Sequence, residues 1–108
     1  MRKKNNFPSE AEMEILEYVW KESRPLSHVD FLTHFNESGK DWKKQTVNTF
    51  VQRLMEKGYL KKIPGRNKRS FLYEASMTKD EYLHILAYHV VNTSYGGSLE
   101  SFIKHYQN

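Results

Sequence analysis

Residues 41–54, with the sequence DWKKQTVNTFVQRL, carry amide, hydroxyl and guanidinium side chains at helical spacing. At about 100° per residue these side chains would occupy one face of a helix. Asn and Gln can form two hydrogen bonds with adenine, Thr can bond a base as donor or acceptor, and Arg can bind guanine through two nitrogens. A face that served solubility alone would more often carry Glu and Lys. The pattern therefore predicts a surface that reads DNA bases, formed by Gln45, Asn48, Thr49, Gln52 and Arg53.

Positive charge is concentrated in the same part of the chain. Residues 41–73 contain nine Lys and Arg but two Asp and Glu, although the net charge of the whole chain is only +4. Such a cluster favours a polyanionic partner; on charge alone, a solvated basic loop is the other interpretation. With duplex DNA as the partner, the cations would neutralise phosphates and provide affinity for any sequence. The predicted backbone contacts are Lys43, Lys44, Arg66, Asn67, Lys68 and Arg69.

Two helices must precede this surface, and both begin with a capping box. Ser9 pairs with Glu12 in the first box and Ser27 pairs with Asp30 in the second, while Pro25 separates the two helices. Their apolar residues recur at helical spacing, which predicts one core-facing side for each helix. The expected core residues are Met13, Leu16, Val19 and Trp20 in the first helix and Val29, Leu32 and Phe35 in the second.

The remaining elements are also predicted from periodicity and turn residues. In the third helix the buried side is expected to be Val47, Phe50, Val51 and Leu54, and Gly58 is placed to end the helix. Two short strands, rich in aromatic and branched residues, should follow and enclose the basic turn PGRNKR. Thr78 with Glu81 then begins a fourth helix, and a fifth follows the break NTSYGGS.

Three helices followed by a hairpin are typical of a winged helix-turn-helix, in which the third helix enters the major groove. The predicted fold class is therefore mainly α with a small antiparallel β-hairpin, a winged helix-turn-helix plus C-terminal dimerisation helices. We expect residues 1–76 to form the DNA-binding domain and residues 77–108 to form a helical dimerisation region.

Several classes of protein are disfavoured by composition and motifs. The chain has no cysteine, so it can form neither a disulfide nor a thiolate metal site, which fits a cytoplasmic protein. His84 and His89 would point about 140° apart on a helix and are a poor metal pair. No phosphate loop, nucleophile motif or paired carboxylates were found, so an enzyme is not expected. No cofactor or metal is predicted. No membrane insertion is predicted either, since no segment reaches roughly 18 apolar residues.

Three stretches resemble the penicillinase-repressor family of bacterial transcriptional regulators, which includes BlaI, MecI and CopY. They are SEAEMEILEYVW, DWKKQTVNTFVQRLMEKGYL and the YGG that precedes the last amphipathic helix. The resemblance covers about residues 7–106. It implies a homodimeric winged-helix repressor that binds a partly palindromic operator and controls genes of resistance or stress.

The resemblance also implies roles for single positions. The family's base-reading positions correspond to Thr46 and Asn48, whereas Lys43 and Lys44 stand where members commonly have Ser-Pro. Antibiotic-responsive members are inactivated by a sensor protease that cuts an Asn-Phe bond. The nearest match to that bond is Ser101-Phe102.

Dimerisation is also expected on physical grounds, because one short recognition helix contacts too few bases to define a unique genomic site. The apolar sides of the last two helices are too small to bury each other fully. They would form the interface, although they could instead fold back onto their own domain. The predicted interface residues are Leu83, Leu86, Val90, Leu99, Phe102 and Ile103. An alternative function is a winged-helix module that binds an acidic protein without operator specificity.

Overall fold

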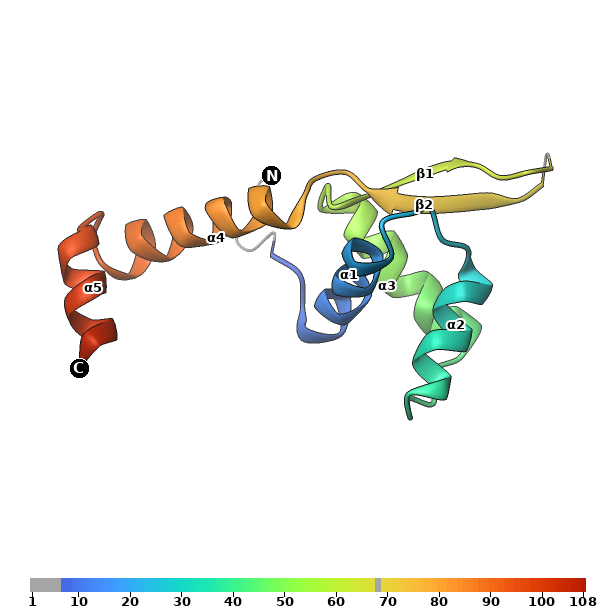
Figure 1. Ribbon diagram of the computed structural model, residues 1–108, viewed down its shortest axis with the longest axis horizontal. Coiled ribbons are helices and arrows are strands. Elements are labelled where there is room, and N and C mark those ends of the chain that lie inside the picture. Colours follow the sequence, from blue (N-terminus) through green and yellow to red (C-terminus); the bar gives the residue numbers. More distant parts are fainter. Residues whose placement is uncertain (1–6, 68) are drawn as a thin grey trace. The chain divides into compact units, whose positions relative to one another are not determined.

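The computed structural model describes residues 7–67 and 69–108. The order of elements confirms the predicted fold class, with helices predominating and one two-stranded antiparallel hairpin (Figure 1). The chain divides into two compact units, one ending at Ser76 and the other beginning at Met77. The elements are α1 (Glu10–Glu22), α2 (His28–Glu37), α3 (Lys44–Glu56), β1 (Leu60–Pro64), β2 (Phe71–Ala75), α4 (Lys79–Ser94) and α5 (Leu99–Gln107).

The capping boxes expected at three helix starts are confirmed. Ser9 caps α1, Ser27 caps α2 and Thr78 caps α4, and each accepts a bond from the backbone N–H three residues later. The acidic residue at that third position bonds back to the cap, so two otherwise unpaired N–H groups are satisfied at each start. In contrast, α3 follows Lys43, which makes no side-chain cap bond.

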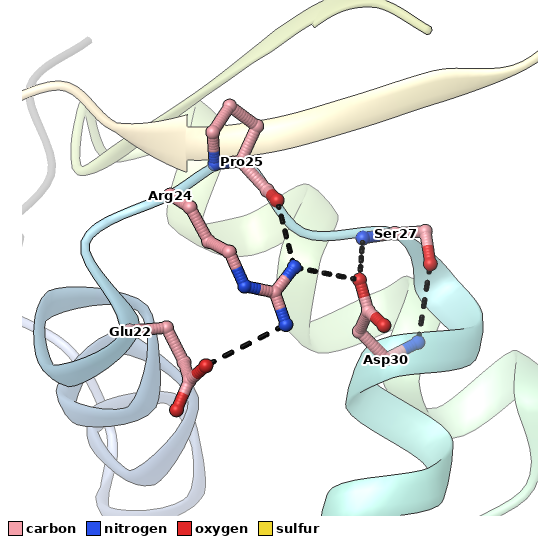
Figure 2. Close-up of polar contacts among 5 residues, drawn as sticks. All are labelled: Glu22, Arg24, Pro25, Ser27 and Asp30. Atoms are coloured by element: carbon pink, nitrogen blue, oxygen red, sulfur yellow. Dashed lines mark hydrogen bonds and ion pairs between the residues drawn. The ribbon is translucent and has the colours of Figure 1, made fainter. Parts of the chain in front are cut away.

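The connection between α1 and α2 is held by Arg24, as Figure 2 shows. Its guanidinium lies 3.5 Å from Glu22 at the end of α1 and 3.6 Å from Asp30 in α2, and it donates to the carbonyl of Pro25. Asp30 also accepts from the backbone N–H of Ser27 at 2.9 Å. Exposed ion pairs of this kind contribute little stability. Their effect here is to join the end of α1 to the start of α2.

The core of the first unit lies between its three helices and the hairpin, and it corrects part of the sequence prediction. Leu16 and Val19 are buried as expected, but Ile15 is fully buried, whereas Met13 and Trp20 are only partly covered. The core also includes Val47, Val51 and Leu54 of α3, as predicted, with Phe50 half-buried.

On α2, Phe35 is buried as expected, but the rest of the expected inward side is wrong. Val29 is 68% exposed and Leu32 is only partly covered, whereas Phe31 is fully buried and lies one turn from Phe35. An α-helix brings residues four apart onto one side, so the two phenylalanines form the buried stripe. In a helix of ten residues, both phases include Phe35, and periodicity alone could not separate them.

The hairpin is attached to the helices through one additional backbone pairing. β1 and β2 pair from Leu60 with Ala75 to Pro64 with Phe71. Leu26, in the connection between α1 and α2, forms an isolated antiparallel bridge with Tyr73 through two hydrogen bonds of 2.8 and 2.9 Å. The bridge fixes the start of α2 against β2. At the turn, a Cβ on Gly65 would lie 2.3 Å from Ser70 Oγ and 3.2 Å from the Ser70 carbonyl carbon, so any side chain here would force Ser70 to shift.

The second unit consists of α4, α5 and the glycine turn between them. Tyr95 at the end of α4 packs edge-on against Phe102 of α5, and its hydroxyl lies 2.7 Å from His105 Nδ1. Within the described ranges no helix is long and apolar enough to span a membrane. The described part of the chain also contains no cluster of three His, Cys, Asp or Glu residues that could hold a metal ion.

Candidate nucleic-acid interface

The exposed face of α3 carries the side chains predicted to read bases. Burial of Val47, Val51 and Leu54 on one side of the helix leaves the other side in solvent. Thr46, the position implied by family resemblance, is half-buried at the edge of this face. The exposed members are Gln45, Asn48, Thr49, Gln52 and Arg53, which we call the α3 face.

Trp42 anchors the beginning of α3 through an interaction that the sequence did not reveal. The side chain of Asn36 bonds both backbone groups of Trp42, accepting from its N–H at 2.8 Å and donating to its carbonyl at 3.0 Å. The indole packs against the rings of Phe35 and Phe50, and the ammonium of Lys40 lies 5.5 Å from its centre. These contacts set the position of the first turn of α3. Lys43 and Lys44 are exposed there.

The other end of α3 is attached to α1 through a nearly buried ion pair. Lys57 Nζ donates to Glu12 Oε1 at 2.7 Å and to the carbonyl of Phe7 at 3.1 Å. Burial alone would raise the pKa of Glu12, but hydrogen bonds from Lys57 and the Ser9 backbone and the charges of Lys57 and Arg53 lower it overall. Glu12 is therefore ionised at neutral pH, and the pair fixes the direction of α3 relative to α1.

Two side chains of the α3 face already have partners within the protein. The Thr49 hydroxyl donates to the Gln45 carbonyl at 3.0 Å, so its oxygen remains available only as an acceptor. Asn48 Oδ1 lies 3.2 Å from Nε2 of His28, the first residue of α2. The sequence contained no signal for His28, because its contact lies 20 positions along the chain. Asn48 therefore faces solvent with its carbonyl oxygen already engaged.

The turn of the hairpin between β1 and β2 also carries cations. Arg66, Asn67 and Arg69 are exposed, and no ion pair joins either arginine to another described residue. The predicted contact Lys68 lies outside the described residues. Further along the strands, Lys61 pairs with Glu74 at 3.3 Å and the Lys62 ammonium lies 4.4 Å from the ring centre of Phe71. The turn thus presents positive charge that its own unit does not neutralise.

Burial and charges in β1 and at the start of α3 lower the pKa of His28. Burial lowers the pKa of His28, and the charges of Lys44 in α3 and Lys62 in β1 lower it further, whereas the bond to Asn48 opposes the shift. His28 is therefore neutral at pH 7. The charges of Lys44 in α3 and Lys62 in β1 therefore act on one imidazole at the start of α2.

The predicted dimer residues lie on α4 and α5 of the second unit. Leu83, Leu99 and Ile103 are exposed, whereas Leu86, Val90 and Phe102 are half-buried. Ser101, in the proposed cleavage bond, is exposed within α5, and its backbone N–H bonds the Ser98 cap at 3.1 Å. The unit therefore leaves apolar side chains of both helices in solvent.

Three comparisons relate this chain to known proteins. The sequence model of the penicillinase repressor family matches residues 8–108. The penicillinase repressor of Bacillus licheniformis is 25% identical over 95 residues, which cover 88% of this chain and 71% of that protein. A solved structure of the ferric uptake regulator from Francisella tularensis with iron is similar in fold, with a TM-score of 0.58 at 15% identity; the match covers 89% of this chain and 85% of that one.

Proposed function

Because the chain belongs to the penicillinase repressor family, we propose that it represses its target genes as a homodimer that reads a partly palindromic operator through α3. Its general role is that of a DNA-binding transcriptional repressor rather than an enzyme. Under this proposal the protein acts in the cytoplasm, where the operator is accessible. The regulated genes would be those of antibiotic resistance or a related stress.

The α3 face is the observation that carries the proposal. Its exposed groups are amides, hydroxyls and one guanidinium, the types that match base edges in the major groove. Exposed cations lie at the start of the helix, Lys43 and Lys44, and in the hairpin turn, Arg66 and Arg69. Phosphate contacts from these cations would position the domain while the α3 face selects the sequence.

The dimer would be formed by the second unit. Solvent-exposed leucine and isoleucine on α4 and α5 make a surface that a second copy of the chain could cover through a two-fold axis. Two recognition helices would then read two half-sites about one helical turn apart. Cleavage of Ser101-Phe102 by a sensor protease stays a prediction. It would remove Phe102 and Ile103 from the proposed interface.

Alanine variants of the α3 face test the base-reading role. We expect Asn48→Ala or Gln52→Ala to cost about 1–3 kcal/mol of operator binding per half-site, with little change on random duplex. The measurement is a competition titration in which an operator selected from a random pool competes with random duplex. Gln107→Ala, which removes an exposed amide from α5, is the matched control. Equal losses on both duplexes would reject base reading, and a wild type without sequence preference would favour a protein-binding module.

Arg66→Ala tests the backbone role of the hairpin. The substitution should weaken operator and random duplex alike and reduce the slope of log affinity against log salt by about one for each phosphate that is no longer neutralised. Lys104→Ala removes an exposed cation from α5 and should leave the slope unchanged. The slope is obtained from titrations at a series of salt concentrations. An unchanged slope for Arg66→Ala would place that arginine away from the DNA.

A further inference from the structure

The contact between His28 and Asn48 joins the start of α2 to the middle of the α3 face. Nε2 of His28 and Oδ1 of Asn48 are 3.2 Å apart. A carbonyl oxygen can only accept a hydrogen bond, so Nε2 must carry the proton and donate it. His28 is therefore either protonated on both nitrogens or neutral with its proton on Nε2. At neutral pH it is the second form, since its pKa lies below the usual value.

The imidazole is held in place before any partner binds. His28 follows Ser27, whose capping box with Asp30 fixes the first turn of α2 (Figure 2). The ring packs edge-on against Tyr73, with centroids 5.2 Å apart and planes at 85°. Tyr73 is itself buried and bridged to Leu26, just before the helix. Backbone and ring contacts from α2 and β2 thus orient the donor toward α3.

We propose that His28 is a positioning residue for operator recognition, which orients the Asn48 amide by donating from Nε2 to Oδ1. This inference rests on the proposed function of the α3 face. An exposed asparagine samples several rotamers and can present either its oxygen or its nitrogen. The bond from His28 holds the oxygen toward α2, so the two hydrogens of Nδ2 remain available to the partner. The base opposite Asn48 should therefore offer an acceptor, such as N7 of a purine, O6 of guanine or O4 of thymine.

The charges around His28 favour a role in positioning Asn48 over a role in binding phosphate. Partial burial favours the neutral imidazole and lowers the pKa of His28, and the charges of Lys44 in α3 and Lys62 in β1 act in the same direction. A neutral ring adds no charge for phosphates to attract. Its effect on binding should therefore appear through Asn48 and depend on sequence, whereas the lysines act on any duplex.

The test is a double-mutant cycle with a selection experiment on the full chain. Fragments bound from a random duplex pool are sequenced for wild type, His28→Ala, His28→Gln, Asn48→Ala and the His28→Ala, Asn48→Ala double variant. Glutamine can place an N–H donor near the position of imidazole Nε2, so His28→Gln is the rescue variant. His34→Ala is the control, because His34 lies on the same helix and stacks on Tyr18 at 3.8 Å.

The expected result is a loss of preference at one base pair per half-site in both His28→Ala and Asn48→Ala. His28→Ala should lower affinity for the selected duplex about fivefold per half-site and leave binding to random duplex unchanged. The same substitution should have no further effect when Asn48 is already alanine, and His28→Gln should restore the preference.

Two outcomes would overturn the inference, and a third would remove its premise. Additive losses in the double variant would show that His28 acts independently of Asn48. If His28→Ala keeps the base preference that Asn48→Ala loses, then the Asn48 amide needs no positioning by His28. A wild type that selects no sequence at all would instead reject the proposed function, and with it the role of His28.

Discussion

Leu83→Asp is expected to split the homodimer and to lower affinity for the selected operator by about a hundredfold or more. Leu83 is 46% exposed within its own unit, so a carboxylate there costs the monomer little. In the proposed dimer the same side chain would be covered by a second copy. Two unpaired carboxylates would then lose their solvation without a compensating partner. Sedimentation of wild type and variant measures the mass, and titration of the operator measures the affinity.

Ile85→Asp is the matched control for that experiment. Ile85 lies on the same helix, is 43% exposed and is also aliphatic, but two positions along α4 place it about 160° from Leu83. We expect Ile85→Asp to retain the wild-type mass and operator affinity. If Ile85→Asp splits the dimer and Leu83→Asp does not, the interface uses the opposite side of α4. If neither changes the mass, α4 is not an interface between copies.

Lys57→Met is expected to reduce the free energy of unfolding by about 3–5 kcal/mol at neutral pH. The substitution keeps much of the side-chain volume but removes the ammonium that pairs with Glu12. The Glu12 side chain is only 2% exposed and that of Lys57 is 16% exposed, so the carboxylate would remain buried without its cation. Urea unfolding followed by circular dichroism measures the difference. A loss below about 0.5 kcal/mol would show that water replaces the ammonium without penalty.

The same ion pair predicts a dependence of stability on pH. The folded-state pKa of Glu12 lies below its ordinary value of 4.5, so its contribution is fully present above that value and is lost as the pH falls through the folded-state pKa. In Lys57→Met, burial is no longer opposed by Lys57, and Glu12 should protonate more readily. The difference in the free energy of unfolding between Lys57→Met and wild type should therefore become smaller as the pH falls. Adding Glu12→Gln to Lys57→Met should recover stability at neutral pH, since glutamine keeps an oxygen for Ser9 N–H without a charge.

Local patterns in the sequence were sufficient to predict the helices, three of their caps and the hairpin. Capping boxes at Ser9, Ser27 and Thr78 depend on residues three positions apart, so each can be recognised without knowing the fold. The buried side of α3 could be predicted because its apolar residues recur at the helical spacing i, i+3, i+4 and i+7 from Val47 to Leu54. The exposed face of that helix, with the residues on it that are proposed to read bases, followed from the same period.

Tertiary structure decided which side chains meet across elements. Val29 and Phe31 of α2 compete for the core within a short helix, and packing against Tyr18 of α1 and Tyr73 of β2 selected the phenylalanine. The contacts of Asn48 with His28 and of Glu12 with Lys57 join positions 20 and 45 residues apart. Helical period specifies the direction of a side chain around its own axis, whereas such contacts also require the angle and distance between two axes. Those depend on how the whole core packs, and a single sequence does not display them.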